Sequence, residues 1–145
     1  MRFKVVFLFL FSTSAWATEV KLECTISGKN FSREDTKEYQ ITFDDNEQRI
    51  CTVYPCKRAS TYKMNETISY AGYDNEKVSN TVETWSKDII EFRSRLGGST
   101  GEYTLDRTSG TLSNVYINRK FEVRVNMKGP CKLVKKFANE QQRKF

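Results

Sequence analysis

The sequence predicts an all-β protein, a small antiparallel up-and-down barrel of about eight strands. Three observations lead to this fold class. Short segments in which apolar and polar side chains alternate recur about every ten residues, which is the pattern of strands with one buried face. Turn-forming Gly, Asn and Asp residues separate these segments. No segment before Cys131 repeats its apolar residues with a helical period, which excludes a doubly wound α/β fold.

The expected strands follow one another along the whole chain. The first, residues 20–26, alternates apolar and polar side chains and ends at Gly28. The last, residues 121–127, has the most regular alternation, and we expect Gly129-Pro130 to end it. The strands expected between them lie at residues 39–43, 50–54, 68–70, 82–84, 90–92, 103–105 and 111–118. Gly110 supplies the left-handed residue that a three-residue hairpin loop requires.

Closure of the sheet follows from the number of short strands. An open antiparallel sheet exposes two edges, and an exposed edge can pair with another molecule. Closure into an up-and-down barrel similar to that of the lipocalins removes both edges, so we expect this architecture. A sandwich of two packed sheets is the alternative.

The first part of the chain, residues 1–17, is typical of a secretory signal peptide. Arg2 and Lys4 supply its positive charge, residues 5–11 are continuously apolar, and Ala17 ends a small-x-small cleavage site. The apolar run is shorter than the roughly 20 residues that a membrane-spanning helix needs. We therefore expect a periplasmic or secreted protein that is soluble after cleavage at Ala17.

The remaining chain divides into a barrel domain, residues 18–130, and a basic C-terminal helix or tail, residues 131–145. Leu133, Val134 and Phe137 would form a short apolar stripe on that helix. The segment after the signal carries a net charge of +4, concentrated near the C-terminus. Candidate contacts to an anionic membrane surface or lipopolysaccharide are Lys128, Lys132, Lys135, Lys136, Arg143 and Lys144. The alternative is a solvated tail, so we expect residues 137–145 to contribute little to folding.

Four cysteines in a small secreted chain indicate disulfides. Of the three possible pairings we favour Cys24 with Cys131 and Cys51 with Cys56. The first bridge would join the first and last strands of a closed barrel, and the second would close a short loop. A metal site is disfavoured, because the chain has no histidine and no C-x-x-C pair.

Three short motifs resemble those of a loose group of small uncharacterised periplasmic and secreted proteins of Gram-negative bacteria. The motifs are LEC at Leu22–Cys24, LDRTSG at Leu105–Gly110 and G-x-C at Gly129–Cys131. The group carries an I/L-D-R-x-x-G hairpin and a late cysteine. The resemblance implies an extracytoplasmic β protein and supplies no catalytic residue. In the hairpin, we expect Asp106 and Arg107 to form a structural pair or to cap the turn.

Enzymatic chemistry is disfavoured by the residues that it would need. Without histidine, a nucleophile with an imidazole base and a histidine metal site are both excluded. The carboxylate pairs Asp44-Asp45 and Asp35 with Glu38 lie at turn signals, where such residues bond the backbone. The glycine-rich segment 97–101 lacks the lysine and the helix of a phosphate loop. We therefore expect no catalytic residue and no cofactor.

Binding is the class of function that remains. One hypothesis is a protein-binding module, of the inhibitor or immunity type, that uses Tyr70, Tyr73 and Trp85 in or beside the loop at residues 71–80. The second is a carrier of a small apolar or amphiphilic ligand inside the barrel. These rings could instead fill the core. The positive charge favours an acidic protein over a basic hydrolase such as lysozyme. Nucleic acid is disfavoured, because aromatic and basic residues are not interleaved.

Overall fold

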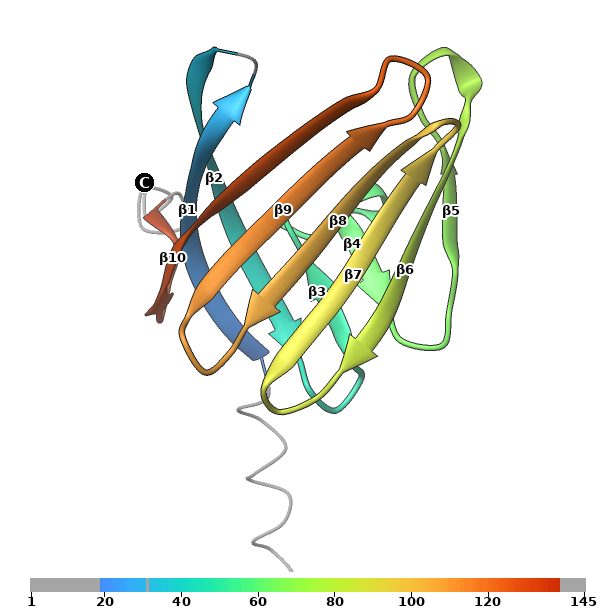
Figure 1. Cartoon of the computed structure of the whole chain (residues 1–145). Helices are drawn as coiled ribbons and strands as arrows, with labels where there is room; N and C mark the ends of the chain where they lie inside the picture. Colours follow the sequence, from blue (N-terminus) through green and yellow to red (C-terminus); the bar gives the residue numbers. More distant parts are fainter. Residues whose placement is uncertain (1–18, 31, 139–145) are drawn as a thin grey trace, which may run out of the picture.

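Residues 19–30 and 32–138 are described by the computed structural model, and in this part of the chain ten strands form one antiparallel sheet (Figure 1). The predicted all-β up-and-down barrel is confirmed, with ten strands in place of about eight. The strands are β1 (Glu19–Asn30), β2 (Arg33–Asp44), β3 (Arg49–Cys51), β4 (Thr61–Lys63), β5 (Ile68–Ala71), β6 (Lys77–Trp85), β7 (Ile89–Leu96), β8 (Ser99–Asp106), β9 (Thr111–Asn118) and β10 (Val123–Val134). The predicted signal peptide lies outside the described residues.

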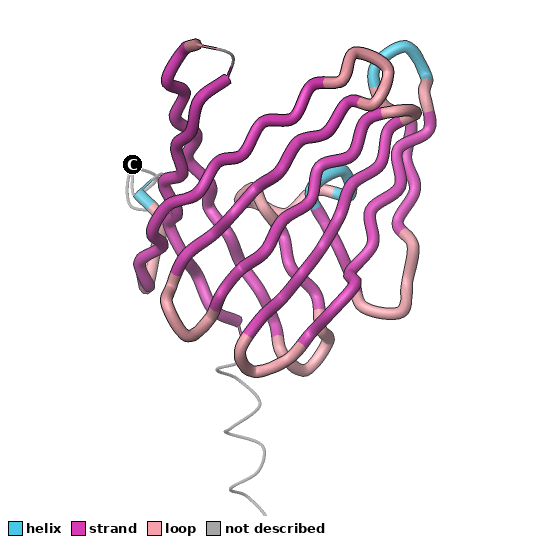
Figure 2. Tube along the Cα trace, in the orientation of Figure 1, coloured by secondary structure: helices cyan, strands magenta, loops and turns pink. Residues whose placement is uncertain are grey.

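The sheet follows a simple meander with one additional pairing. Its strand order is β4-β3-β2-β1-β10-β9-β8-β7-β6-β5, so β1 pairs with β10 and every other pair is consecutive in the chain, except that β4 and β5 do not pair. Strands β4 and β5 are therefore the two edges. The sheet curls round on itself, as the trace in Figure 2 shows. Its edge strand β4 lies against both β5 and β6. The barrel is thus nearly closed, with its seam between β4 and β5.

Hydrogen bonds from side chains close this seam, in place of hydrogen bonds between the backbones of two paired strands. Asn80 of β6 is fully buried, and its Nδ2 donates to the carbonyl oxygens of Ala59 and Thr61 at 3.0 and 3.2 Å. Arg58 donates from Nε to the carbonyl oxygen of Ser69 at 3.0 Å. These bonds satisfy backbone acceptors that an open edge would leave to solvent.

Two glycines allow β1 and β10 to approach each other closely. A Cβ atom on Gly129 would lie 1.9 Å from the carbonyl oxygen of Thr25, and one on Gly28 would lie 2.1 Å from that of Asn126. Neither position therefore tolerates a side chain without a shift of the backbone. Glycines of this kind let the sheet coil sharply enough to close.

Apolar side chains from both halves of the sheet fill the barrel. The residues that form this core include Ile26, Ile41, Phe43, Ile50, Tyr62, Ile90, Phe92, Leu105, Leu112 and Met127. At mid-height, the Phe92 ring stacks on Tyr103 with centroids 4.8 Å apart, and Tyr62 lies 4.7 Å from Phe92. Burial raises the pKa of the Tyr62 and Tyr103 phenols above their usual range. Rings rather than open space thus occupy this level of the interior.

Both predicted disulfides are present, Cys24–Cys131 and Cys51–Cys56. Cys24 and Cys131 lie directly opposite each other in the β1–β10 pair, so the long-range bridge joins the first and last strands of the sheet. Two disulfides in a small domain are typical of an oxidising compartment outside the cytoplasm. Among the described residues, no helix is long and apolar enough to cross a membrane.

The C-terminal segment differs from its prediction. Strand β10 continues through Gly129-Pro130 to Val134, because the ladder with β1 resumes at Cys131 and holds residues 131–134 extended. The predicted helix therefore does not form there, and Leu133 is 73% exposed. Phe137 is fully buried against Tyr54, with ring centroids 5.0 Å apart. Phe137 thus belongs to the fold, contrary to the expectation for residues 137–145.

Candidate binding surface

The structure does not bring together the three aromatic residues that the sequence suggested as one contact site. Tyr73 begins a single 3-10 turn (Tyr73–Asn75) before β6, and Trp85 is the last residue of β6. A nine-residue strand is about 27 Å long, so Tyr73 and Trp85 lie at opposite ends of the barrel. Tyr70 pairs with the buried Val78 and faces the interior with it. Of the three predicted residues, only Tyr73 is fully available to a large partner.

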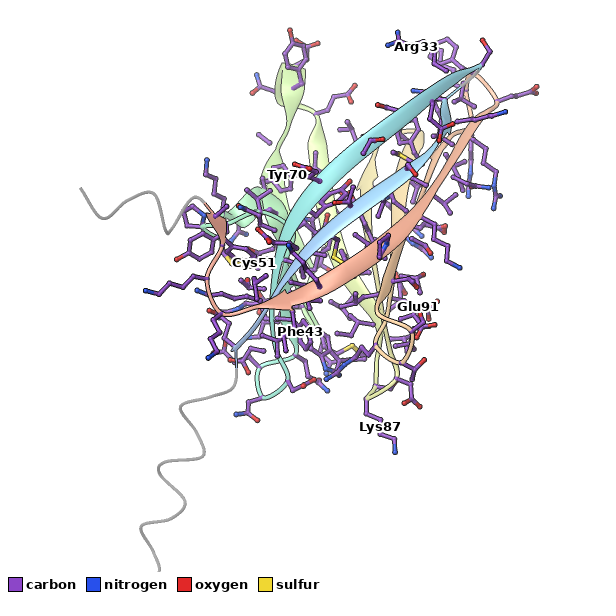
Figure 3. All side chains as sticks on the ribbon, turned by 90° about the vertical axis from the view of Figure 1, so that its left-hand side faces the viewer. Arg33, Phe43, Cys51, Tyr70, Lys87 and Glu91 are labelled. Atoms are coloured by element: carbon purple, nitrogen blue, oxygen red, sulfur yellow. A yellow bond between two sulfur atoms is a disulfide. The ribbon has the colours of Figure 1, made fainter. Side chains whose placement is uncertain are left out.

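Trp85 belongs to a set of interactions that ties three loops together. Its indole Nε1 donates to Asp45 Oδ1 at 2.9 Å, and its ring contacts Phe43 edge-on at 6.2 Å. Arg107 donates through Nη1 and Nη2 to the two oxygens of Asp45, at 2.9 and 2.8 Å. It also bonds the carbonyl oxygen of Ser86 at 2.9 Å. We call the loops 45–48, 86–88 and 107–110 the braced end; Figure 3 labels Lys87 here and Arg33 at the opposite end.

The LDRTSG hairpin supplies two separate parts of this brace. Asp106 Oδ1 accepts hydrogen bonds from the backbone amides of Thr108 and Ser109, which confirms the expected cap. Arg107 pairs with Asp45 across the barrel end rather than with Asp106. Hydrogen bonds from Thr108 and Ser109 lower the pKa of Asp106 to about 2, and the Arg107 guanidinium lowers the pKa of Asp45. The motif is therefore structural at both residues.

Three other loops meet at the opposite end of the barrel: residues 72–76, 97–98 and 119–122 (Figure 1). The amide of Arg119 donates to the carbonyl oxygen of Gly98 at 3.2 Å, which joins two of them. The Glu76 carboxylate approaches the position of a Cβ on Gly97 within 3.8 Å, which places the third loop beside them. We call this surface the aromatic end.

Large aromatic side chains are exposed on the aromatic end. Tyr73 is 87% exposed, Phe121 is 67% exposed and Tyr116 is 38% exposed. The sequence prediction missed Phe121 as a contact, because its alternation with Val123 assigned it to the last strand. In the structure it lies in the loop before β10, next to Glu122, whose φ is 53°. A positive φ at a glutamate is characteristic of a turn rather than a strand.

The backbone that carries these rings is well defined by hydrogen bonds. Asn118 Oδ1 accepts from the amides of Lys120 and Phe121 at 3.1 and 3.3 Å. The Tyr116 hydroxyl bonds Ser99 Oγ at 3.1 Å and accepts from Asn118 Nδ2 at 3.4 Å. These two bonds lower the pKa of the Tyr116 phenol, with Ser99 the larger cause. The aromatic end thus presents exposed rings on an ordered scaffold.

Comparisons with known proteins add only distant structural similarities. No protein-family model and no curated protein matches the sequence. Two solved structures of HpuA from Kingella denitrificans are similar in fold: HpuA in complex with human haemoglobin, with a TM-score of 0.42, and the apo haemoglobin receptor HpuA, with 0.41. Each is 10% identical, and each match covers 79% of this chain and 42% of the HpuA chain. This chain therefore spans less than half of the HpuA chains.

The basic residues proposed for an anionic surface are spread along one strand and beyond it. Lys128 and Lys132 are exposed on β10, and Lys132 lies 3.8 Å from the Glu23 carboxylate. Lys135 and Lys136 follow β10 and are exposed. Arg143 and Lys144 lie outside the described residues.

The carboxylates considered for catalysis serve turns or ion pairs. Asp44 Oδ1 accepts from the amides of Asn46 and Glu47, and Asp45 pairs with Arg107. Asp35 Oδ1 accepts from the amide of Thr36. Within the described part of the chain, no group of three metal-ligating side chains comes together.

Proposed function

We propose that this protein is a non-enzymatic binding protein of the periplasm or the secreted fraction, and that it engages a partner protein through its aromatic end. The observation that carries the proposal is the exposure of Tyr73 and Phe121 on two neighbouring, ordered loops. Monomeric proteins bury most large aromatic side chains, because each ring buries 150–250 Å² of surface when covered. Aromatic side chains on rigid loops are preferred anchors of protein interfaces.

The interior supports this proposal over a carrier of an apolar ligand. Tyr62, Phe92 and Tyr103 pack face to face or at a tilt across the barrel, with centroid separations of 4.7–4.8 Å for the two closest pairs. A ligand at that level would have to displace rings that already pack at van der Waals distance. The exposed rings, by contrast, need no rearrangement to meet a partner.

Site-specific photo-crosslinking tests the proposal. Two variants carry a photoreactive phenylalanine analogue, one in place of Tyr73 and one in place of Phe121. Each is incubated with the native periplasmic or secreted fraction and irradiated, and the crosslinked proteins are identified by mass spectrometry. Leu133 is the matched control, because it is a similarly exposed apolar residue on another surface. We expect one protein to crosslink from both test positions and not from Leu133.

The isolated pair then gives the energetic test. Tyr73→Ala and Phe121→Ala should each weaken binding at least tenfold, as expected of interface anchors, and Leu133→Ala should change it less than twofold. Crosslinking that is equal at all three positions, or binding that is unaffected by both substitutions, would contradict the proposal.

A further inference from the structure

We propose that a groove on the outer face of β7, β8 and β9 binds a carboxylate side chain of an acidic partner protein. This inference rests on the proposed function and specifies the chemistry of the partner. The groove is lined by Arg93, Arg95, Thr100, Glu102, Ile117 and Arg119, and we call it the arginine groove. Strands β7, β8 and β9 lie at the front of the barrel in Figure 1.

The size of the groove suits a single anionic group. Its volume is about 250 Å³. Sites for whole small-molecule ligands occupy about 300–1,000 Å³, so this hollow is below that range. It is large enough for the carboxylate end of one Glu or Asp side chain with its hydration.

Cross-strand register explains why the charges gather here. Arg95 of β7 lies opposite Thr100 of β8, which lies opposite Ile117 of β9. Residues directly opposite each other in antiparallel strands share a face, so Arg95 lies on the same face as a small hydroxyl and an apolar side chain. Arg119 follows β9 and lines the same groove from the loop.

The balance of charge in the groove is positive. Glu102 is the one carboxylate among its lining residues, against three guanidinium groups. Arg95 and Arg119 are exposed, and neither forms an ion pair with another described residue. Two guanidinium groups beside one hollow can therefore both donate to an incoming anion.

Arg93 gives an independent indication of a missing acceptor. Its Nε atom is buried and has no hydrogen-bond partner among the described residues. The Glu83 carboxylate lies 3.8 Å from Nε and the Glu102 carboxylate lies 3.8 Å from Nη2, and both distances are longer than a charged hydrogen bond of about 2.7–2.9 Å. A buried donor without an acceptor is costly, and a small movement of the Arg93 side chain toward the groove would let an incoming carboxylate oxygen accept from Nε.

The groove adjoins the aromatic end through the chain itself. Arg119 is two residues before Phe121, and its amide holds the loop at Gly98. Arginine next to exposed aromatic rings is the composition of an interface centre. A partner that covers Phe121 would thus place its neighbouring side chains over the groove. The complementary side chain there is acidic.

Nuclear magnetic resonance titration tests the inference with defined probes. Protein labelled with ¹⁵N is titrated with a capped tetraglutamate peptide, and the Nε–Hε signal of Arg93 is followed together with the amide of Arg119. We expect both signals to shift saturably, and the affinity to fall as salt is raised. Inorganic phosphate should bind more weakly than the peptide; equal or tighter phosphate binding would overturn the assignment to a carboxylate side chain.

Two double variants with the same change of charge complete the test. Arg95→Gln with Arg119→Gln should weaken peptide binding at least fivefold. Lys135→Gln with Lys136→Gln, outside the groove, should change it less than twofold. An equal loss in both variants, or a peptide that leaves the Arg93 signal unchanged, would overturn the inference. Tyr73→Ala with Phe121→Ala should leave peptide binding intact, so failure of the groove is distinguishable from failure of the aromatic surface.

Discussion

The two ends of this barrel use side chains of similar chemistry in opposite ways. At the braced end, Trp85 and Arg107 are turned inward over the loops, where both bond Asp45. At the aromatic end, Tyr73 and Phe121 point away from the protein and contribute few contacts. Aromatic and arginine side chains therefore stabilise the fold at one end and remain free for recognition at the other. The difference teaches that residue type alone does not identify a binding surface in a small barrel.

The C-terminal segment adds a further set of contacts beside β1. Lys21, near the start of β1, holds its Nζ 5.1 Å from the Tyr54 ring and 5.6 Å from the Phe137 ring. Tyr54 belongs to the loop that the Cys51–Cys56 bridge closes. Lys21, Tyr54 and Phe137 therefore form a small cluster of their own.

The largest effect on this comparison is expected from Phe137→Ala. Removal of a fully buried ring should lower the free energy of unfolding by about 3 kcal/mol. Chemical denaturation measures this value. Leu133→Ala, in the same segment but exposed, is the control and should change it by less than about 0.5 kcal/mol. Equal stability of the two variants would show that Phe137 is not part of the fold.

Arg107→Ala should have the next largest effect. It removes two charged hydrogen bonds to Asp45, one to Ser86, and a guanidinium 4.9 Å from the Phe43 ring. We expect a loss of about 2 kcal/mol by denaturation. Arg107→Lys should recover part of it, because lysine keeps the charge but not the paired geometry. Arg95→Ala, at the other end, should be close to neutral, and a similar loss there would remove the distinction between the ends.

Acid should weaken the braced end selectively. The folded pKa of Asp106, about 2, and the lowered pKa of Asp45 are below the unfolded value of about 4. Their ionised forms therefore stabilise the fold above pH 4, and this contribution is lost as pH falls from 4 towards 2. Thermal unfolding across this range should show a shallower decline for Asp106→Asn than for the parent protein. Asp74→Asn, at the aromatic end, is the matched change of charge and should keep the parent's decline.

The smallest effect on stability is expected from Tyr73→Ala and Phe121→Ala. Each side chain is mostly exposed, so the free energy of unfolding should change by less than about 0.5 kcal/mol. The same variants should bind more weakly to the partner that crosslinking identifies. A large loss of stability would instead show that these rings are structural, and the contrast between the two ends would no longer hold.

Much of the fold could be predicted from the sequence, because alternation and turn residues are local signals. They located nine of the ten strands and the class of barrel. Strand β4, Thr61–Lys63, was missed because Tyr62 is its only apolar residue, so it shows no alternation. The extension of β10 past Pro130 was also missed, since only pairing with β1 holds that segment extended. The candidate site was harder, because exposure of a ring depends on what packs over it.

The sequence by itself determined the all-β meander, because strand period and turn chemistry act over short distances. It favoured, among three pairings, the two disulfides that the structure contains. The tertiary structure alone decided which aromatic side chains are exposed. Trp85 meets Asp45 across 40 residues and Arg107 meets it across 62, and no local pattern records such contacts. The position of the arginine groove likewise depends on the register of three strands, which only the folded sheet sets.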